Sequence, residues 1–146
     1  TTLDEYLERK LWGPLGMEKD AKWAKDINGH TKPYCCLHAI ALDYAKLGRL
    51  YMNKGNWNGQ QILNQAWIEN TLKRDTTDGG TFGYRNSWYL GYAEYNDFMA
   101  IGLHKQHLYV NPEKNVIIVS LNTKPKTKAQ STLNWEDICR QIVDQL

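Results

Sequence analysis

The first half of the chain alternates helical patterns with turn residues. Thr2-Leu-Asp-Glu5 has the capping-box pattern, and apolar residues then recur every three or four positions, so a short amphipathic helix is expected to begin there. It should end at Trp12-Gly-Pro14, because glycine and proline continue a helix poorly. Residues 18–34 show no period and contain turn residues, which predicts an irregular surface segment.

A longer helix is predicted over residues 39–53. Its polar residues fall on one narrow stripe, so we expect the helix to be buried on most of its circumference. Asp43 is expected to be an exposed partner of Lys46 and not a catalytic acid, because no second carboxylate is placed beside it. Gly55 should end this helix, and Asn64 should cap a further helix over residues 65–73.

After a loop over residues 75–81, the spacing changes to that of β-strands. The expected strands cover residues 82–90, 97–103, 107–111 and 116–121. The last of these is apolar nearly throughout, which suits a strand covered on both faces. Asn111–Asn115 has good turn chemistry and predicts an antiparallel hairpin, and Asn134 is expected to cap a closing helix with one apolar face.

This order of elements predicts an α+β fold in which helices flank an antiparallel sheet. Neither a repeat nor a linker divides residues 1–146, which have the length of one ordinary domain.

Charge and composition narrow the possible partners. A net charge of +2 argues against nucleic acid, and no apolar run approaches the roughly 20 residues that span a bilayer. No signal-peptide pattern opens the chain, which begins at Thr1 directly at a helix start. We interpret it as a processed or truncated product, so the localisation of the parent protein stays undetermined.

The three cysteines form neither a metal-binding spacing nor a disulfide framework. Cys35 and Cys36 are adjacent and Cys139 is distant, so we interpret all three as small apolar residues.

The residues most suggestive of chemistry gather where two strand-like runs meet, which indicates the wall of a pocket. They are Gly102, Leu103, His104, Lys105 and Gln106. In contrast, Ser87, Ser120 and Ser131 are each followed three residues later by a residue other than lysine. If this is a hydrolase site, half of it is missing.

Four segments in order resemble the C-terminal part of serine β-lactamase-like hydrolases, namely the class C β-lactamases, penicillin-binding esterases and 6-aminohexanoate-dimer hydrolases. They are Pro14-Leu-Gly-Met17, Leu42-Asp-Tyr-Ala-Lys-Leu-Gly-Arg-Leu50, Gly55-Asn-Trp-Asn-Gly-Gln-Gln-Ile-Leu63, and residues 102–106 with their Tyr-Val-Asn-Pro-Glu-Lys continuation. The resemblance covers almost the whole chain and implies part of a β-lactamase/transpeptidase-like fold.

The resemblance implies an acyl-enzyme mechanism whose nucleophile lies upstream of the matched region. The family's Ser-x-x-Lys and Tyr-x-Asn motifs precede the Pro-Leu-Gly-Met segment, so no catalytic residue is assigned in this chain. Tyr51-Met-Asn53 and Tyr109-Val-Asn111 match the second motif by letter, but the first lies in the predicted long helix and the second runs into a hairpin turn.

Residues 102–106 resemble the family's third motif, which often reads Gly-x-His-Gly-Gln and lies on a strand beside the nucleophile. There a backbone N–H aimed at the developing oxyanion is worth about a hundredfold or more in rate. Gly102 would let substrate approach the backbone, and His104 or Lys105 would supply charge or a hydrogen bond. Lys105 departs from the usual glycine. Lys126-Thr-Lys128 resembles the Lys-Thr-Gly form of this motif without its glycine, and we interpret it as a solvated loop.

The implied substrate is a small amide, ester or β-lactam. No cofactor is implied, and a metal shared by His104 and His107 is not expected, because their spacing places them on opposite faces of a strand. The family also fits a periplasmic or exported protein.

Two alternatives stay open. Tyr84 and Trp88 would let aromatic strands of a non-catalytic module stack on a saccharide or peptide. Otherwise, the chain would associate with a copy of itself or with a separate N-terminal chain, because a sheet deprived of neighbouring strands has an open edge.

Overall fold

The computed structural model describes residues 1–75, 77, 83–122 and 134–146. Its centre is a five-stranded antiparallel sheet in the order β5 to β9. The strands are β5 (Gly83–Arg85), β6 (Trp88–Leu90), β7 (Phe98–Ile101), β8 (His107–Asn111) and β9 (Val116–Ser120). Consecutive strands pair throughout, which confirms the predicted antiparallel hairpin at Asn111–Asn115.

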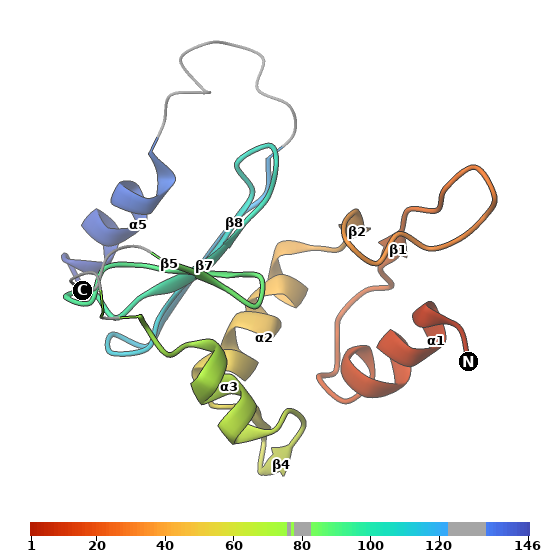
Figure 1. Cartoon of the computed structure of the whole chain (residues 1–146), viewed down its shortest axis with the longest axis horizontal. Helices are drawn as coiled ribbons and strands as arrows, with labels where there is room; N and C mark the ends of the chain where they lie inside the picture. The colour runs from red at the N-terminus through yellow and green to blue at the C-terminus, as the bar shows by residue number, and fades with distance from the viewer. Residues whose placement is uncertain (76, 78–82, 123–133) are drawn as a thin grey trace.

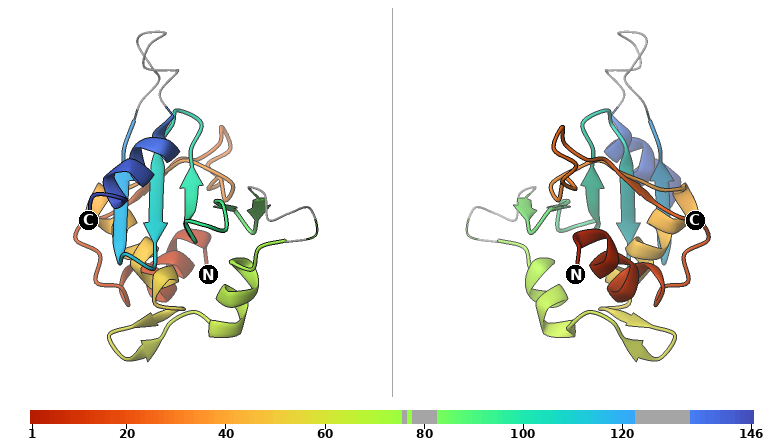
Figure 2. Two further views of the ribbon diagram at one scale, coloured as in Figure 1. Left: turned by 90° about the vertical axis from the view of Figure 1, so that its left-hand side faces the viewer. Right: turned by 90° about the vertical axis from the view of Figure 1, so that its right-hand side faces the viewer.

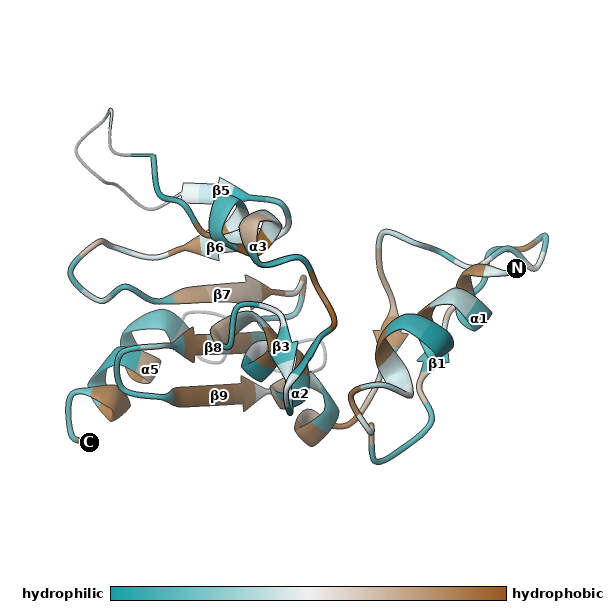
Figure 3. Ribbon diagram, turned by 90° about the horizontal axis from the view of Figure 1, so that it is seen from below, coloured by the Kyte–Doolittle hydropathy of each residue, from teal (hydrophilic) through white to brown (hydrophobic). Residues whose placement is uncertain are grey.

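Two helices cover opposite faces of this sheet, as Figures 1 and 3 show. They are α2 (Ala41–Met52) and α5 (Trp135–Val143). The α2 face buries Phe98, Leu108 and Val110, whereas the α5 face buries Met99 and Tyr109. Side chains therefore alternate between two cores along β7 and β8, as strand geometry requires. The predicted α+β class, in which helices flank an antiparallel sheet, is confirmed.

The contact between α2 and the sheet is close because Gly48 lies at its centre. A Cβ atom at Gly48 would stand 3.0 Å from Leu108 Cδ1 and 3.1 Å from Val110 Cγ2. Glycine thus lets the helix backbone approach the sheet more closely than any other residue would.

The remaining elements lie outside the sheet and its two covering helices. A second lobe (Figures 1 and 2) holds α1 (Leu3–Leu7), the π-helical turn η1 (Glu8–Trp12) and the strand pair β1 (Lys22–Trp23) and β2 (Leu37–His38). The hairpin β3 (Asn56–Trp57) with β4 (Gln60–Gln61) leads into α3 (Gln65–Thr71). The predicted caps are confirmed, because Thr2 forms both hydrogen bonds of a capping box and Asn64 and Asn134 accept N-cap hydrogen bonds.

Asp43 is not the exposed partner of Lys46 that the pattern predicted. Its side chain is fully buried and accepts hydrogen bonds from the backbone N–H groups of Glu18 (2.7 Å) and Lys19 (3.3 Å). Lys46 instead pairs with Glu18 at 2.8 Å. The prediction was wrong because the segment at Glu18 and Lys19 packs over the polar face of the helix at Asp43. Helical periodicity carries no information on such a tertiary contact.

The long helix is also less enclosed than predicted. Its fully buried residues are Asp43, Gly48 and Leu50, whereas Leu42 is 54% exposed. The continuous strand expected over residues 82–90 is in fact β5 and β6 joined by a tight turn, in which Asn86 and Ser87 both have positive φ. The segment at 18–34 is largely irregular, as predicted, apart from β1 and an isolated bridge between Lys25 and Thr31.

Within the described ranges, none of the helices is long and apolar enough to cross a membrane. Lys126-Thr-Lys128 and most of the predicted 75–81 loop lie outside the described residues.

Candidate functional site

The segment Gly102–Gln106 is the turn between β7 and β8 and not part of a strand. Gly102 N–H donates to the Gln106 carbonyl at 2.8 Å, and Lys105 N–H donates to the Gly102 carbonyl at 3.0 Å. The position differs from the predicted strand because these two hydrogen bonds close the chain on itself directly after Ile101. The predicted third motif nonetheless follows β7 directly, because β7 ends at Ile101 and the motif begins at Gly102.

Gln106 holds the interior of this turn. Its side-chain Oε1 accepts a hydrogen bond from His104 N–H at 2.9 Å, and its Nε2 donates to the Asn122 carbonyl at 2.9 Å. Asn122 Nδ2 donates back to the Lys105 carbonyl at 3.0 Å. The side chain of Gln106 and that of Asn122 therefore tie the turn to the chain that leaves β9. The sequence analysis did not identify Asn122. In the structure, His107 pairs with Ser120, so the antiparallel register brings Asn122 beside Lys105.

Lys105 occupies the left-handed region of backbone space, with φ +63°. A residue with a Cβ atom pays a cost there that glycine does not. This conformation gives a physical reason for the glycine that is usual at this position of the resembled motif.

Gly102 is required by the packing of the turn. A Cβ atom built on Gly102 would stand 2.4 Å from Gln106 Oε1, although the φ of Gly102 itself is not positive. Next to it, Leu103 is 93% exposed, and its backbone N–H has no acceptor among the described residues. The turn thus presents an open backbone donor beside a residue with no side chain.

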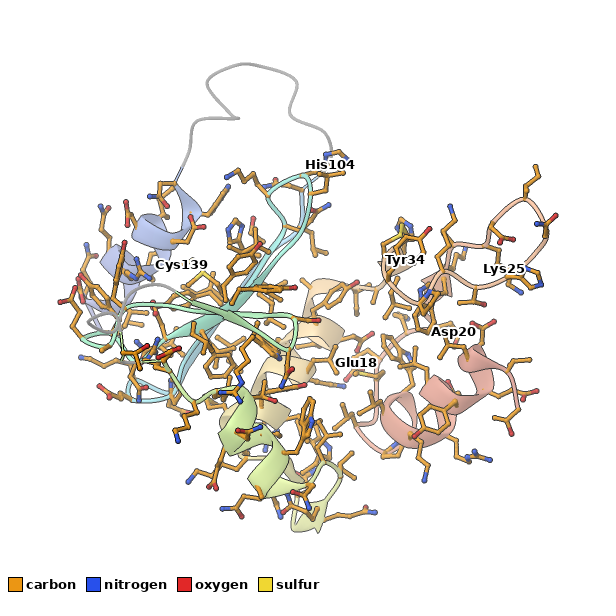
Figure 4. All side chains as sticks on the ribbon, viewed as in Figure 1. Glu18, Asp20, Lys25, Tyr34, His104 and Cys139 are labelled. Carbon is orange, nitrogen blue, oxygen red and sulfur yellow. A yellow bond between two sulfur atoms is a disulfide. The ribbon has the colours of Figure 1, made fainter. Side chains whose placement is uncertain are left out.

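The buried side chain of His107 contacts the backbone of the turn. Its ring is 2% exposed, and Nδ1 lies 3.0 Å from the Lys105 carbonyl. Its Nε2 faces Glu136 Oε1 on α5 at 3.7 Å. Because a carbonyl oxygen only accepts hydrogen bonds, Nδ1 is the donor in this contact, whereas the buried Nε2 has no hydrogen-bond partner among the described residues. Figure 4 shows His104 at the tip of the same turn.

The two aromatic candidates lie in different environments. Trp88 is 6% exposed and packs against Tyr51 and Phe98 in the α2 core, so its face is not free for stacking. Tyr84 is 63% exposed and lies against Tyr89, with ring centroids 4.7 Å apart. Tyr84 and Trp88 therefore do not form a common platform.

The two tyrosines that match Tyr-x-Asn by letter are unsuited to act as bases. Burial raises the pKa of Tyr109, which is fully enclosed, and it also raises the pKa of Tyr51. A phenol that serves as a general base needs the opposite shift. In the described part of the chain, no three His, Cys, Asp or Glu side chains gather as metal ligands would.

Known proteins resemble this chain over nearly its whole length. A curated 6-aminohexanoate-dimer hydrolase from Paenarthrobacter ureafaciens is 28% identical over 144 residues, which cover 92% of this chain and 36% of that protein. A scan against protein-family models found no match.

Solved structures agree with the sequence relative. A Bacillus anthracis structure described as "putative 6-aminohexanoate-dimer hydrolase" superposes with a TM-score of 0.85 at 27% identity, over 99% of this chain and 39% of that one. A Bacteroides dorei structure described as "putative beta-lactamase" has the same fold, with a TM-score of 0.58 at 17% identity over 86% of this chain and 45% of its own.

These similarities fit a C-terminal portion of a β-lactamase-like serine hydrolase, as the sequence motifs predicted. The chain spans less than half of the length of each of these relatives.

Proposed function

We propose that this chain supplies the third-motif segment of a serine hydrolase that acts on an amide, ester or β-lactam through an acyl-enzyme. The nucleophilic serine, with its Ser-x-x-Lys motif, would come from a part of the parent protein outside these 146 residues. The named relatives support an amide-type substrate, since two of them are described as 6-aminohexanoate-dimer hydrolases.

The observation that carries the proposal is the Leu103 N–H, which has no acceptor among the described residues and follows Gly102, a residue without a side chain. Acyl transfer builds negative charge on the carbonyl oxygen, and a fixed N–H group aimed at that oxygen lowers the barrier. The Gln106 and Asn122 hydrogen bonds fix the turn in advance, so the Leu103 N–H needs no reorganisation when substrate arrives. Lys105 adds positive charge at the same tip.

The experiment is an assay of the chain alone and of a longer parent chain. The 146-residue chain should turn over neither a chromogenic β-lactam nor a p-nitrophenyl ester, because it has no Ser-x-x-Lys. A parent chain that includes the upstream region should be active, and its upstream serine should be trapped as an acyl-enzyme by intact mass. Turnover by the pure 146-residue chain, or a parent chain with no upstream Ser-x-x-Lys, would contradict the proposal.

We further propose that the chain associates through the free edge of β9. In the described part of the sheet, β9 pairs with β8 on one side and has no strand on the other. Its sequence, Val116-Ile-Ile-Val-Ser120, carries neither a charge nor a proline that would block pairing.

A further inference from the structure

The adjacent Cys35 and Cys36 are joined by a disulfide. This finding corrects the expectation that both are simple apolar residues, which was wrong because sequence spacing rules describe distant cysteines that staple a fold. Cys35 is partly buried, Cys36 is exposed, and Cys36 has a φ of +70°. Figure 4 shows sulfur beside Tyr34, in the second lobe and away from the turn at His104.

The backbone on both sides of the disulfide is part of a small hydrogen-bonded unit. Trp23 Nε1 donates to the Cys35 carbonyl at 2.8 Å, and Ala24 N–H donates to the Cys36 carbonyl at 3.0 Å. The next carbonyl, that of Leu37, accepts a hydrogen bond from Tyr44 on α2 at 2.5 Å. The disulfide therefore lies where the β1–β2 pair meets the start of the long helix.

We propose that Cys35–Cys36 is a thiol-exchange site that soluble dithiols open and that closes again on oxidation. Three observations carry this assignment: Cys36 is exposed to an incoming thiolate, the φ of Cys36 is one that a residue with a Cβ atom adopts at a cost, and the two cysteines are adjacent in the sequence. The site is independent of the proposed hydrolase activity.

The exchange is balanced by the reductant. A thiolate of the dithiol attacks one of the two sulfurs, which breaks the Cys35–Cys36 bond, forms a mixed disulfide and releases the other cysteine as a thiol. The second thiol of the reductant then attacks the mixed disulfide and releases the first cysteine. The reductant leaves as its own cyclic disulfide, and Cys35 and Cys36 together gain two electrons and two protons. Reoxidation reverses these bonds with a small disulfide as the acceptor.

The reduced site is a pair of adjacent thiols, which gives it a specific chemical probe. Phenylarsine oxide condenses with two neighbouring thiols, forms two As–S bonds and releases water, whereas it does not form this product with a single thiol. Cys139 serves as an internal control, because it is 1% exposed and burial raises its thiol pKa to about 11.

The test combines native alkylation, mass spectrometry and the arsenical. Without reductant, iodoacetamide should leave Cys35 and Cys36 unmodified in the folded chain. After dithiothreitol, both should be alkylated and one phenylarsine group should bind, while Cys139 stays unmodified until the chain is unfolded. Cys35→Ser and Cys36→Ser should each lose arsenical binding, and Cys139→Ala should keep it.

A structural readout accompanies the chemistry. Because Cys36 can leave its positive φ once the disulfide opens, the Ala24 N–H should exchange with solvent at least about tenfold faster in the reduced chain, while the Leu108 amide in the sheet should not change. Alkylation of Cys35 and Cys36 without reductant, or resistance of the native disulfide to excess dithiothreitol, would overturn the proposal. If a serine variant fails to fold, Cys36→Gly replaces it, because glycine adopts the same φ without cost. This variant also lacks one of the two thiols and should lose arsenical binding.

Discussion

At the scale of single residues, the turn Gly102–Gln106 depends on one side chain and on the absence of another. The Gln106 amide makes one hydrogen bond inside the turn and one to Asn122, and the space it occupies is the space that a Gly102 side chain would need. Gly102 thus has two roles. It places no side chain beside the accessible Leu103 N–H, and it makes room for the Gln106 side chain inside the turn.

This packing predicts that Gly102→Ala and Gln106→Ala are not additive. Gly102→Ala alone should lower the free energy of unfolding by about 1–3 kcal/mol, because the displaced Gln106 amide loses its hydrogen bonds. In a Gln106→Ala background the same change should cost less than about 0.5 kcal/mol, since the clash is gone. Urea unfolding of the four proteins measures both values. Equal costs in the two backgrounds would show that the new methyl group meets something other than Gln106.

The positive φ of Lys105 makes a second prediction. A β-branched residue tolerates the left-handed region poorly, so Lys105→Val should destabilise the fold by about 1–2 kcal/mol, whereas Lys105→Gly should leave the stability unchanged or slightly higher.

Lys73→Val is the matched control for this comparison. Lys73 is also exposed and outside a helix, but its φ is not positive. Thermal and urea unfolding should therefore separate the two valine variants by about 1 kcal/mol or more. If both valine variants lose stability equally, the φ of Lys105 is not the cause.

Sequence reasoning predicted most helices and strands because their signals are local. The N-caps at Thr2, Asn64 and Asn134 and the hairpin at Asn111–Asn115 each depend on side chains within a few residues. The burial of Asp43 and the tie between Gln106 and Asn122 depend on residues 16 or more positions apart, which no period encodes.

At the scale of elements, α5 is fixed to the sheet by a buried ion pair. Arg140 Nε lies 2.8 Å from Asp97 Oδ2, and Asp97 is fully buried. Burial alone would lower the pKa of Arg140, but its hydrogen bond with Asp97 raises the pKa overall. The guanidinium also lies over the rings of Tyr92 and Tyr95, which adds a cation–π contribution.

This pair predicts a strong asymmetry between single and double variants. Asp97→Ala should lower the free energy of unfolding by about 3–5 kcal/mol, because it leaves the buried Arg140 charge with only the exposed Asp137, 3.7 Å away. Asp97→Ala combined with Arg140→Met should recover much of that loss, since no unpaired charge remains. Chemical denaturation followed by circular dichroism measures both. A double variant that is no more stable than Asp97→Ala would show that α5 depends on Arg140 for more than charge pairing.

At the scale of the whole molecule, the sheet has two edges of different character. The β5 edge is short and carries Arg85, whereas the β9 edge is five residues long and apolar. Natural proteins protect such an edge with charge, with proline or with another strand. The chain spans 36% of a curated relative and 39% of a solved one. We therefore propose that a strand from the rest of a longer protein would cover β9.

The free edge of β9 predicts concentration-dependent association of the isolated chain. Sedimentation velocity over about a hundredfold range of concentration should show a shift from monomer toward dimer, and the shift should persist at high salt because backbone pairing and apolar contact are not screened. Ile118 lies in the middle of β9, and its partly buried side chain packs against the α5 core. Ile118→Lys therefore places an inward-pointing charge on the edge strand and should keep the chain monomeric, while Ile118→Leu should associate as the unmodified chain does. Circular dichroism establishes that both variants are folded. Monomer at every concentration, or equal association of the lysine variant, would contradict pairing through β9.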